Sequence, residues 1–164
     1  MKNCFRSMLL LIVLTLSLCL HAPVVLAESV DSPEEVVKTF ARNYFMLDND
    51  MAHYLSREAL YNENEINRVT LYFQLQEQEA AQRGVKMDYL KMRPLLMKTR
   101  VVEEDEDKAV IEFSAVMVRS INPLYRIVGY IFGLIEEHEF ETTVTVVKED
   151  GTWKIGPGGF PLPA

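Results

Sequence analysis

Apolar side chains recur at helical spacing from residue 36 onward. They occupy positions i, i+1, i+4, i+5, i+8 and i+9, namely Val36, Val37, Phe40, Ala41, Tyr44 and Phe45. Before them, Ser32 can cap a helix, Pro33 suits a first turn, and Glu35 is placed to close a capping box. The pattern predicts an amphipathic helix over Pro33–Leu47 with one face on a core. Asp48-Asn49-Asp50 ends it, and Asp50 is expected to cap a short helix at Met51–Leu55.

A second helical pattern covers Asn62–Arg83. Its expected inward positions are Ile66, Val69, Phe73 and Ala80, and glutamines and glutamates occupy the solvated face. Gly84 is the expected stop, because glycine readily adopts the left-handed conformation that follows a helix. A further turn is expected within Lys86–Met92, before Pro94.

The pattern changes to strands at Leu95. An acidic turn at 103–107 separates two predicted strands, Leu95–Val102 and Ala109–Arg119. A third strand is predicted at Glu139–Lys148, where polar and apolar residues alternate. An Asp-Gly turn then leads into a fourth, Thr152–Ile155, which contains the large Trp153. Helices followed by an antiparallel meander predict an α+β fold, with N-terminal helices packed on a curved antiparallel sheet. We expect a single domain over 28–156 and an irregular tail rich in proline and glycine at 157–164.

The order and lengths of these elements resemble the nuclear transport factor 2-like (cystatin-like cone) superfamily, in particular its small exported bacterial members. The residues that carry the resemblance are the Pro-Glu-Glu start of the first helix, the short Asp50–Leu55 element, and the closing strand, Asp-Gly turn and Trp153-Lys154-Ile155. The resemblance implies a cone-shaped cavity between the helices and the sheet.

The first 27 residues have the features of an export signal. Lys2 and Arg6 precede an apolar run, Met8–Leu20, and Val25-Leu26-Ala27 fits a signal peptidase site. The run is shorter than the ~20 residues that a membrane span needs. We therefore predict removal of 1–27 and export, with the bacterial periplasm as the expected destination. Leu16-Ser17-Leu18-Cys19 loosely resembles a lipobox, but Leu18 stands where a small residue is required, so lipidation at Cys19 is disfavoured.

Removing the signal leaves an acidic chain without cysteine. The formal charge goes from −7 to −9 once Lys2 and Arg6 are lost, and both cysteines, Cys4 and Cys19, go with them. An acidic surface without a basic cluster excludes nucleic acid as an expected partner. Thiol catalysis, disulfides and cysteine metal sites are excluded as well. His53 and His138 are far apart without a third ligand at metal spacing, so neither a metal nor a cofactor is expected.

The resemblance also implies where a catalytic base would lie in members that are enzymes. An acid or histidine near the end of the first helices faces a tyrosine or second acid, and the nearest candidates are Tyr44, Asp48 and His53, with Tyr54 beside them. A carboxylate in an apolar pocket has a raised pKa and can act as an acid or base. The interpretation that competes with catalysis is that Asp48 belongs to a turn and helix cap and that His53 lies on the surface.

The segment Ile121–Ile135 does not fit a minimal domain. It reads INPLYRIVGYIFGLI, carries the single charge of Arg126, and falls where a short turn between two strands would suffice. Three interpretations compete: a plug for the mouth of the cone, an apolar patch for a protein partner or a homodimer, and a peripheral contact with a membrane or lipid.

Three function classes follow. The first is an exported, non-enzymatic binding or accessory protein that engages an apolar small molecule or a protein partner through the cavity or through 121–135. Its expected binding residues are Phe40, Tyr44, Phe73, Phe113, Met117, Tyr125, Tyr130 and Phe132. The second is a small cofactor-independent isomerase or dehydratase using the Asp or His base. A purely structural envelope protein, with no cavity, is a third class.

Overall fold

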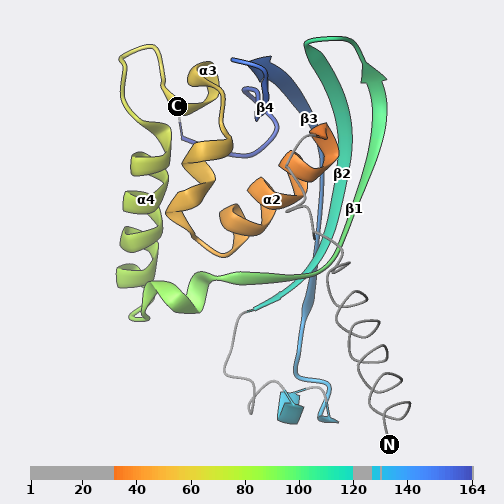
Figure 1. The fold of residues 1–164 in the computed structure, drawn as a ribbon. Helices are drawn as coiled ribbons and strands as arrows, with labels where there is room; N and C mark the ends of the chain where they lie inside the picture. The colour runs from red at the N-terminus through yellow and green to blue at the C-terminus, as the bar shows by residue number, and fades with distance from the viewer. Residues whose placement is uncertain (1–31, 120–126, 130, 164) are drawn as a thin grey trace, which may run out of the picture.

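The computed structural model describes residues 32–119, 127–129 and 131–163 (Figure 1). The predictions that concern the signal segment at 1–27, Cys19, Tyr125 and Tyr130 lie outside these residues. Helices come first along the chain and four strands follow. The fold class predicted above is confirmed: helices pack against one face of an open antiparallel sheet.

The first helix, α2 (Pro33–Phe45), begins as its sequence predicts. The Ser32 hydroxyl accepts a hydrogen bond from the Glu35 amide at 3.2 Å, and Pro33 occupies the first turn. The helix ends two residues before the predicted position, with Leu47 in the left-handed region at φ 50°. The next element is the 3₁₀ helix η1 (Asn49–Tyr54), and the side chain that caps it is Asp48, not Asp50.

Helix α4 (Arg68–Gln82) starts later than the apolar pattern predicts. A turn precedes it, in which the Asn62 side-chain oxygen accepts from the amides of Asn64 and Ile66, and Asn67 then caps the helix. Ile66 is consequently exposed, and the prediction that it faces inward is wrong. Helix α3 (Arg57–Leu60) lies before this turn, and the 3₁₀ helix η2 (Met87–Leu90) links α4 to the sheet.

The sheet is a meander of β1 (Met92–Glu104), β2 (Lys108–Arg119), β3 (Glu137–Glu149) and β4 (Thr152–Ile155). Phe113 is paired with Thr99 on one side and Thr142 on the other, which places these three side chains on the same face. Ile111, paired with Val144, shares that face, and it is the face that carries the buried residues. β4 is short and pairs only with the end of β3, from Val146 to Glu149.

The core lies between α2 and this sheet face. Val37 and Phe40 of α2 and Ile111 of β2 are completely shielded from solvent. In Figure 1 the lower end of β3 runs below the helices. The end of β2 lies beside η2, where the Arg119 guanidinium is 4.9 Å from the centre of the Tyr89 ring, and β1 pairs with β2 as far as Arg119.

Candidate functional site

The interior between α2 and the sheet is filled by a side chain from the end of the chain. Phe160 is 6% exposed, although it belongs to a segment, Gly156–Pro163, that forms neither helix nor strand. Its ring lies 4.8 Å from that of Phe40, and further ring neighbours at 5.3–6.3 Å are Tyr44, Phe45, Phe113 and Phe140. Such offset and edge-to-face contacts are the favoured arrangements of aromatic rings. The C-terminal segment thus supplies the central ring of the core.

Polar side chains of the body hold the same segment by its backbone. Tyr44 donates its hydroxyl to the carbonyl of Pro161 at 3.1 Å, and Thr142 donates to that of Gly159 at 2.8 Å. Arg68 donates twice, from Nε to Pro163 at 2.7 Å and from Nη2 to Leu162 at 3.0 Å. Because proline has no amide hydrogen, carbonyl acceptors are the hydrogen-bonding groups that Pro161 and Pro163 offer. Helices and sheet both hold the segment in place.

Tyr44 does not act alone in this contact. The ring of Tyr72 stacks on it, with the two ring centres 4.9 Å apart. Burial raises the pKa of both phenols above the usual value of 10.0, and for Tyr72 the neighbouring Tyr44 adds to the increase. Both tyrosines therefore remain protonated at neutral pH. The Tyr44 hydroxyl therefore remains a donor to the tail, and the Tyr72 ring packs against the Tyr44 ring.

The structure places the binding residues predicted for the cone interior in two groups. Phe40, Tyr44 and Phe113 belong to the ring cluster around Phe160, so they contact one another and the tail. Phe73 is half-buried with its ring 5.8 Å from that of Tyr72, and Met117 is buried in the same core. Within the described residues, then, the chain's own Phe160 occupies the position expected for an apolar ligand.

The three candidate catalytic residues do not converge. Tyr44 is buried with its hydroxyl donated to the tail, whereas Asp48 is exposed and caps η1. The His53 side chain is 81% exposed and lies 4.0 Å from Asp50 on the surface. Tyr54, half-buried, packs against the core from η1. No enclosed site brings a buried acid or base to face Tyr44 among the residues that the structure describes.

The segment predicted to act as a plug projects into solvent where it is described. Residues 127–129 and 131 are helical, with amide-to-carbonyl bonds from Phe132 to Val128 and from Leu134 to Gly129. Five large apolar side chains of this segment are between 42% and 76% exposed: Ile127, Val128, Ile131, Phe132 and Leu134. We call these five residues the apolar tip. Their exposure means that the plug interpretation is wrong for the described part of the segment.

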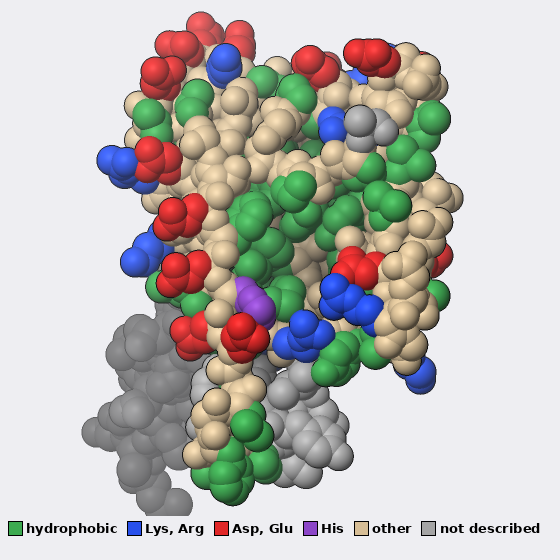
Figure 2. Space-filling view, turned by 180° about the vertical axis from the view of Figure 1, so that it is seen from behind, with side chains coloured by type: hydrophobic (Ala, Val, Ile, Leu, Met, Phe, Trp, Pro, Cys, Tyr) green, Lys and Arg blue, Asp and Glu red, His purple; other side chains and the backbone are tan. Residues whose placement is uncertain are grey.

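Figure 2 shows the consequence for the surface. Hydrophobic side chains gather at the lower end of the molecule, where Figure 1 places the segment between β2 and β3. Exposed acidic residues follow the tip directly on the start of β3: Glu136, Glu137 and Glu139. A second group of hydrophobic side chains lies in the middle of the same face, between the strands and the helices. The tip is separated from that group by polar and charged side chains.

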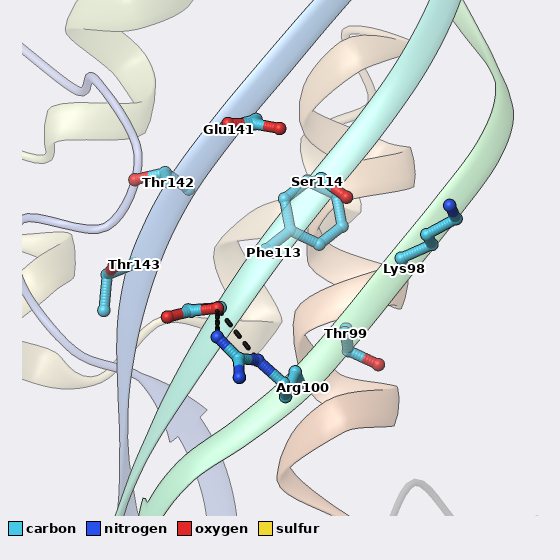
Figure 3. Close-up of a pocket in the computed structure, with 9 residues that line it drawn as sticks. Lys98, Thr99, Arg100, Phe113, Ser114, Glu141, Thr142 and Thr143 are labelled. Carbon is cyan, nitrogen blue, oxygen red and sulfur yellow. Dashed lines mark hydrogen bonds and ion pairs between the residues drawn. The ribbon is translucent and has the colours of Figure 1, made fainter.

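The opposite face of the sheet carries a shallow polar depression of about 660 Å³ (Figure 3). Lys98, Ser114 and Glu141 lie in one row across β1, β2 and β3, and Arg100 pairs with Glu112 beside them at 2.5–3.0 Å. The helices lie behind the strands in this view. The opposite charges neutralise each other, and the row lacks a buried acid, base or nucleophile, so it offers little for chemistry.

A metal site is not apparent in the described ranges. Within 32–119, 127–129 and 131–163, no three His, Cys, Asp or Glu side chains are grouped so that they could hold an ion. His138, paired with Met117 on the inner sheet face, and His53 on η1 belong to different parts of the fold. Nor does any helix in these ranges combine the length and apolar character that crossing a bilayer requires.

Comparison with known proteins yields only distant similarity. No family model matches the chain, and no curated protein matches it. A solved SEC-C motif-containing protein from Rhodopseudomonas palustris is 18% identical, with a TM-score of 0.42 and 83% of each chain covered. The intermembrane space region of the chloroplast protein ARC6 is also 18% identical, with a TM-score of 0.43, covering 80% of this chain and 94% of its own. These likenesses are too distant to assign a family.

Sequence reasoning missed three residues of the tail contact: Phe160, Arg68 and Tyr72. Residues 156–163 have neither helical nor strand periodicity, and their glycines and prolines are typical of a loop. The available signal was the Phe-Pro-Leu run at 160–162, which is unusually apolar for a solvated tail. Arg68 and Tyr72 gave no signal of their own, because their role depends on where the tail lies.

Proposed function

We propose that this chain is an exported, non-enzymatic accessory protein of the nuclear transport factor 2-like type, directed to the bacterial periplasm by residues 1–27. In this proposal it engages a partner protein through the apolar tip at the end of the β2–β3 hairpin. The observation that carries the proposal is the exposure of five large apolar side chains on one short projecting segment, 42–76% each.

Their arrangement supports a binding role. Scattered exposed apolar residues are normal on a protein surface, but a contiguous group is typical of an interaction site. Elsewhere the exposed large hydrophobic residues are spread over separate elements, for example Leu75 on α4 and Tyr89 on η2. An aromatic side chain such as Phe132, set among aliphatic neighbours, is the kind of anchor that dominates binding energy at interfaces.

The charges near the tip favour a protein over a membrane surface. Glu136, Glu137 and Glu139 flank the tip, and the chain as a whole is acidic, with a formal charge of −7. Anionic lipid surfaces repel such a segment, because the surface potential of a membrane attracts lysine and arginine. A partner with an apolar groove and a basic rim would complement both parts of this end of the molecule.

Site-specific photo-crosslinking in the producing cell tests this proposal. A photoreactive phenylalanine analogue replaces Phe132 in one strain and Leu75 in the control strain, since Leu75 is 50% exposed on a distant helix. We expect one discrete crosslinked protein from position 132 and none from position 75. Adding Ile131→Ser to the position-132 strain should remove the crosslink without changing the melting temperature.

Other occupants give different results in the same design. Crosslinks from position 132 to a second copy of this chain would replace the partner with a homodimer. Membrane contact would be shown if the purified chain floats with vesicles, if Phe132→Ser abolishes this flotation, and if Leu75→Ser does not. Identical crosslinks from positions 132 and 75 would contradict a role for the tip.

A further inference from the structure

The contacts of residues 159–163 with the body have the form of a bound peptide. Every side-chain hydrogen bond made to this stretch ends on one of its backbone carbonyl oxygens, at Gly159, Pro161, Leu162 and Pro163. Such bonds tolerate any side chain on the peptide. Selectivity resides in the apolar positions, where Phe160 enters the ring cluster and Leu162 packs at its margin.

This chemistry suits an extended segment rich in proline. Such segments present carbonyls but few amides, and they dock in grooves lined with aromatic rings where hydroxyl and guanidinium groups donate. The tail itself reads Phe-Pro-Leu-Pro, and the groove donors are Tyr44, Arg68 and Thr142. We call these donors, with the rings around Phe160, the tail groove.

The tail groove continues into space that the tail leaves empty. A depression of about 970 Å³ is bordered by Arg68, which also holds the tail, and by Pro157 where the tail begins. Its other walls are polar or charged side chains of α3 and the following turn, among them Arg57, Tyr61, Asn62 and Glu65. A partner segment that continues past Arg68 into this depression would gain further contacts there.

The connection to the tail can open without disturbing the sheet. Gly156-Pro157-Gly158-Gly159 follows β4, and Gly158 adopts φ +91°, a conformation open to glycine and rare for other residues. A side chain at Gly158 would meet no atom within 4 Å, so the backbone there is not packed against the body. Gly156 stays bonded to the Thr145 carbonyl of β3 at 2.7 Å, so rotation at Gly158 is the movement that would release Phe160.

We infer that the tail groove is a second binding site, whose ligand is a proline-rich segment of a partner protein containing an aromatic residue. The chain's own tail occupies this site until such a segment displaces it. A tethered ligand has an effective concentration on the order of millimolar, so a partner segment must bind more tightly than the tail to enter. The proposed extra contacts in the depression at Arg68 supply that advantage. This site is distinct from the apolar tip.

A labelled peptide with the tail's own sequence, PGGFPLPA, is the direct probe. Fluorescence anisotropy compares its binding to the full chain and to the full-length variants Phe160→Ala and Gly159→Ala. The second variant keeps Phe160 but weakens the tail, because a Cβ at Gly159 would approach Val144 to 2.9 Å. We expect at least ~10-fold tighter peptide binding by each variant than by the unaltered chain, since the competing tail is loosened. The control peptide PGGSPLPA should bind to neither variant.

The results separate this site from alternatives. If a variant that retains its fold does not bind the peptide, the tail is an ordinary part of the core. If neither variant folds, the unaltered chain is tested at millimolar peptide, and absence of binding there leads to the same conclusion. Concentration-dependent dimers of the unaltered chain, abolished in Phe160→Ala, would show that a second copy exchanges tails. The tip variant Ile131→Ser should leave peptide affinity unchanged, so this site and the apolar tip can fail independently.

Discussion

Two apolar segments of this chain lie in environments opposite to those that their sequences suggest. The tail at 156–163 is rich in glycine and proline, yet it places Phe160 in the centre of the core. The segment at 121–135 is far more hydrophobic, yet its described side chains are among the most exposed in the molecule. Hydrophobic content therefore does not decide burial here.

The difference follows from where each segment is attached. The tail leaves β4 where the Ile155 carbonyl accepts from the Ser56 amide and the Gly156 amide donates to the Thr145 carbonyl of β3, so a few residues suffice to reach the interior. The tip lies between β2 and β3, strands of 12 and 13 residues, in the segment that joins their ends. The exposure of its described side chains shows that they do not reach the core. Whether a segment is buried thus depends on its distance from the core at its point of attachment as well as on its hydrophobicity.

The largest expected effect is on Phe160. We expect Phe160→Ala to lower the free energy of unfolding by about 3–5 kcal/mol, because it opens a cavity among the five rings that surround Phe160. Chemical denaturation measures the loss. Phe132→Ala is the matched control, since it removes the same side chain from an exposed position. Equal losses for both variants would erase the contrast between tail and tip.

Alkaline pH should act on the tail contact through Tyr44 and Tyr72. The folded state raises both pKa values above the unfolded value near 10, so stability is constant below pH 10 and falls above it. Each tyrosine contributes a loss of up to about 1.4 kcal/mol per pH unit. Denaturation at pH 8 and pH 11 should show this loss, and Tyr44→Phe/Tyr72→Phe should show a smaller one. An equal loss of stability in the unaltered chain and in the double variant would show that these two tyrosines do not cause the pH dependence.

Removing one hydroxyl should have a smaller effect. Tyr44→Phe loses the bond to the Pro161 carbonyl, for an expected destabilisation of about 1 kcal/mol. Hydrogen exchange at the Leu162 amide should accelerate, because this amide bonds only within the tail, to Phe160. Tyr61→Phe is the control, as its side chain is exposed. Unchanged exchange at Leu162 would show that the bond does not retain the tail.

The smallest expected effect on stability is at the tip. The double variant Ile131→Ser/Phe132→Ser should stay within about 0.5 kcal/mol of the unaltered chain, since both side chains are largely exposed. Calorimetry at low protein concentration checks this expectation. A loss of several kcal/mol would mean that the tip packs against the domain, and the difference between the two segments would disappear.

Most of the fold could be predicted from local patterns. Ser32 and Pro33 start α2, and the alternation at Ile111, Phe113 and Ala115 marks the inner face of β2. Boundaries were less certain where a polar side chain competes with the helix, as Asn62 does before α4. These features depend on residues close in sequence, and they were therefore accessible without a structure.

The site could not be predicted to the same extent. The Tyr44–Pro161 bond joins residues 117 positions apart, and no periodicity connects them. The direction of the β2–β3 hairpin likewise depends on strand length relative to the helices. Asp48 and His53 were considered from a resemblance, and their surface positions follow from the cap and turn that they form. Contacts between distant parts of the chain determine what each side chain does.

The position of Phe160 has a consequence for synthesis. The ring that completes the core is synthesised long after the helix it covers, because Phe160 follows Phe40 by most of the described chain. A growing chain would therefore carry the apolar stripe of α2 uncovered until residue 160 has left the ribosome. Contacts of such long sequence separation also slow folding. We therefore expect chaperones that shield apolar helices to bind the unfinished chain.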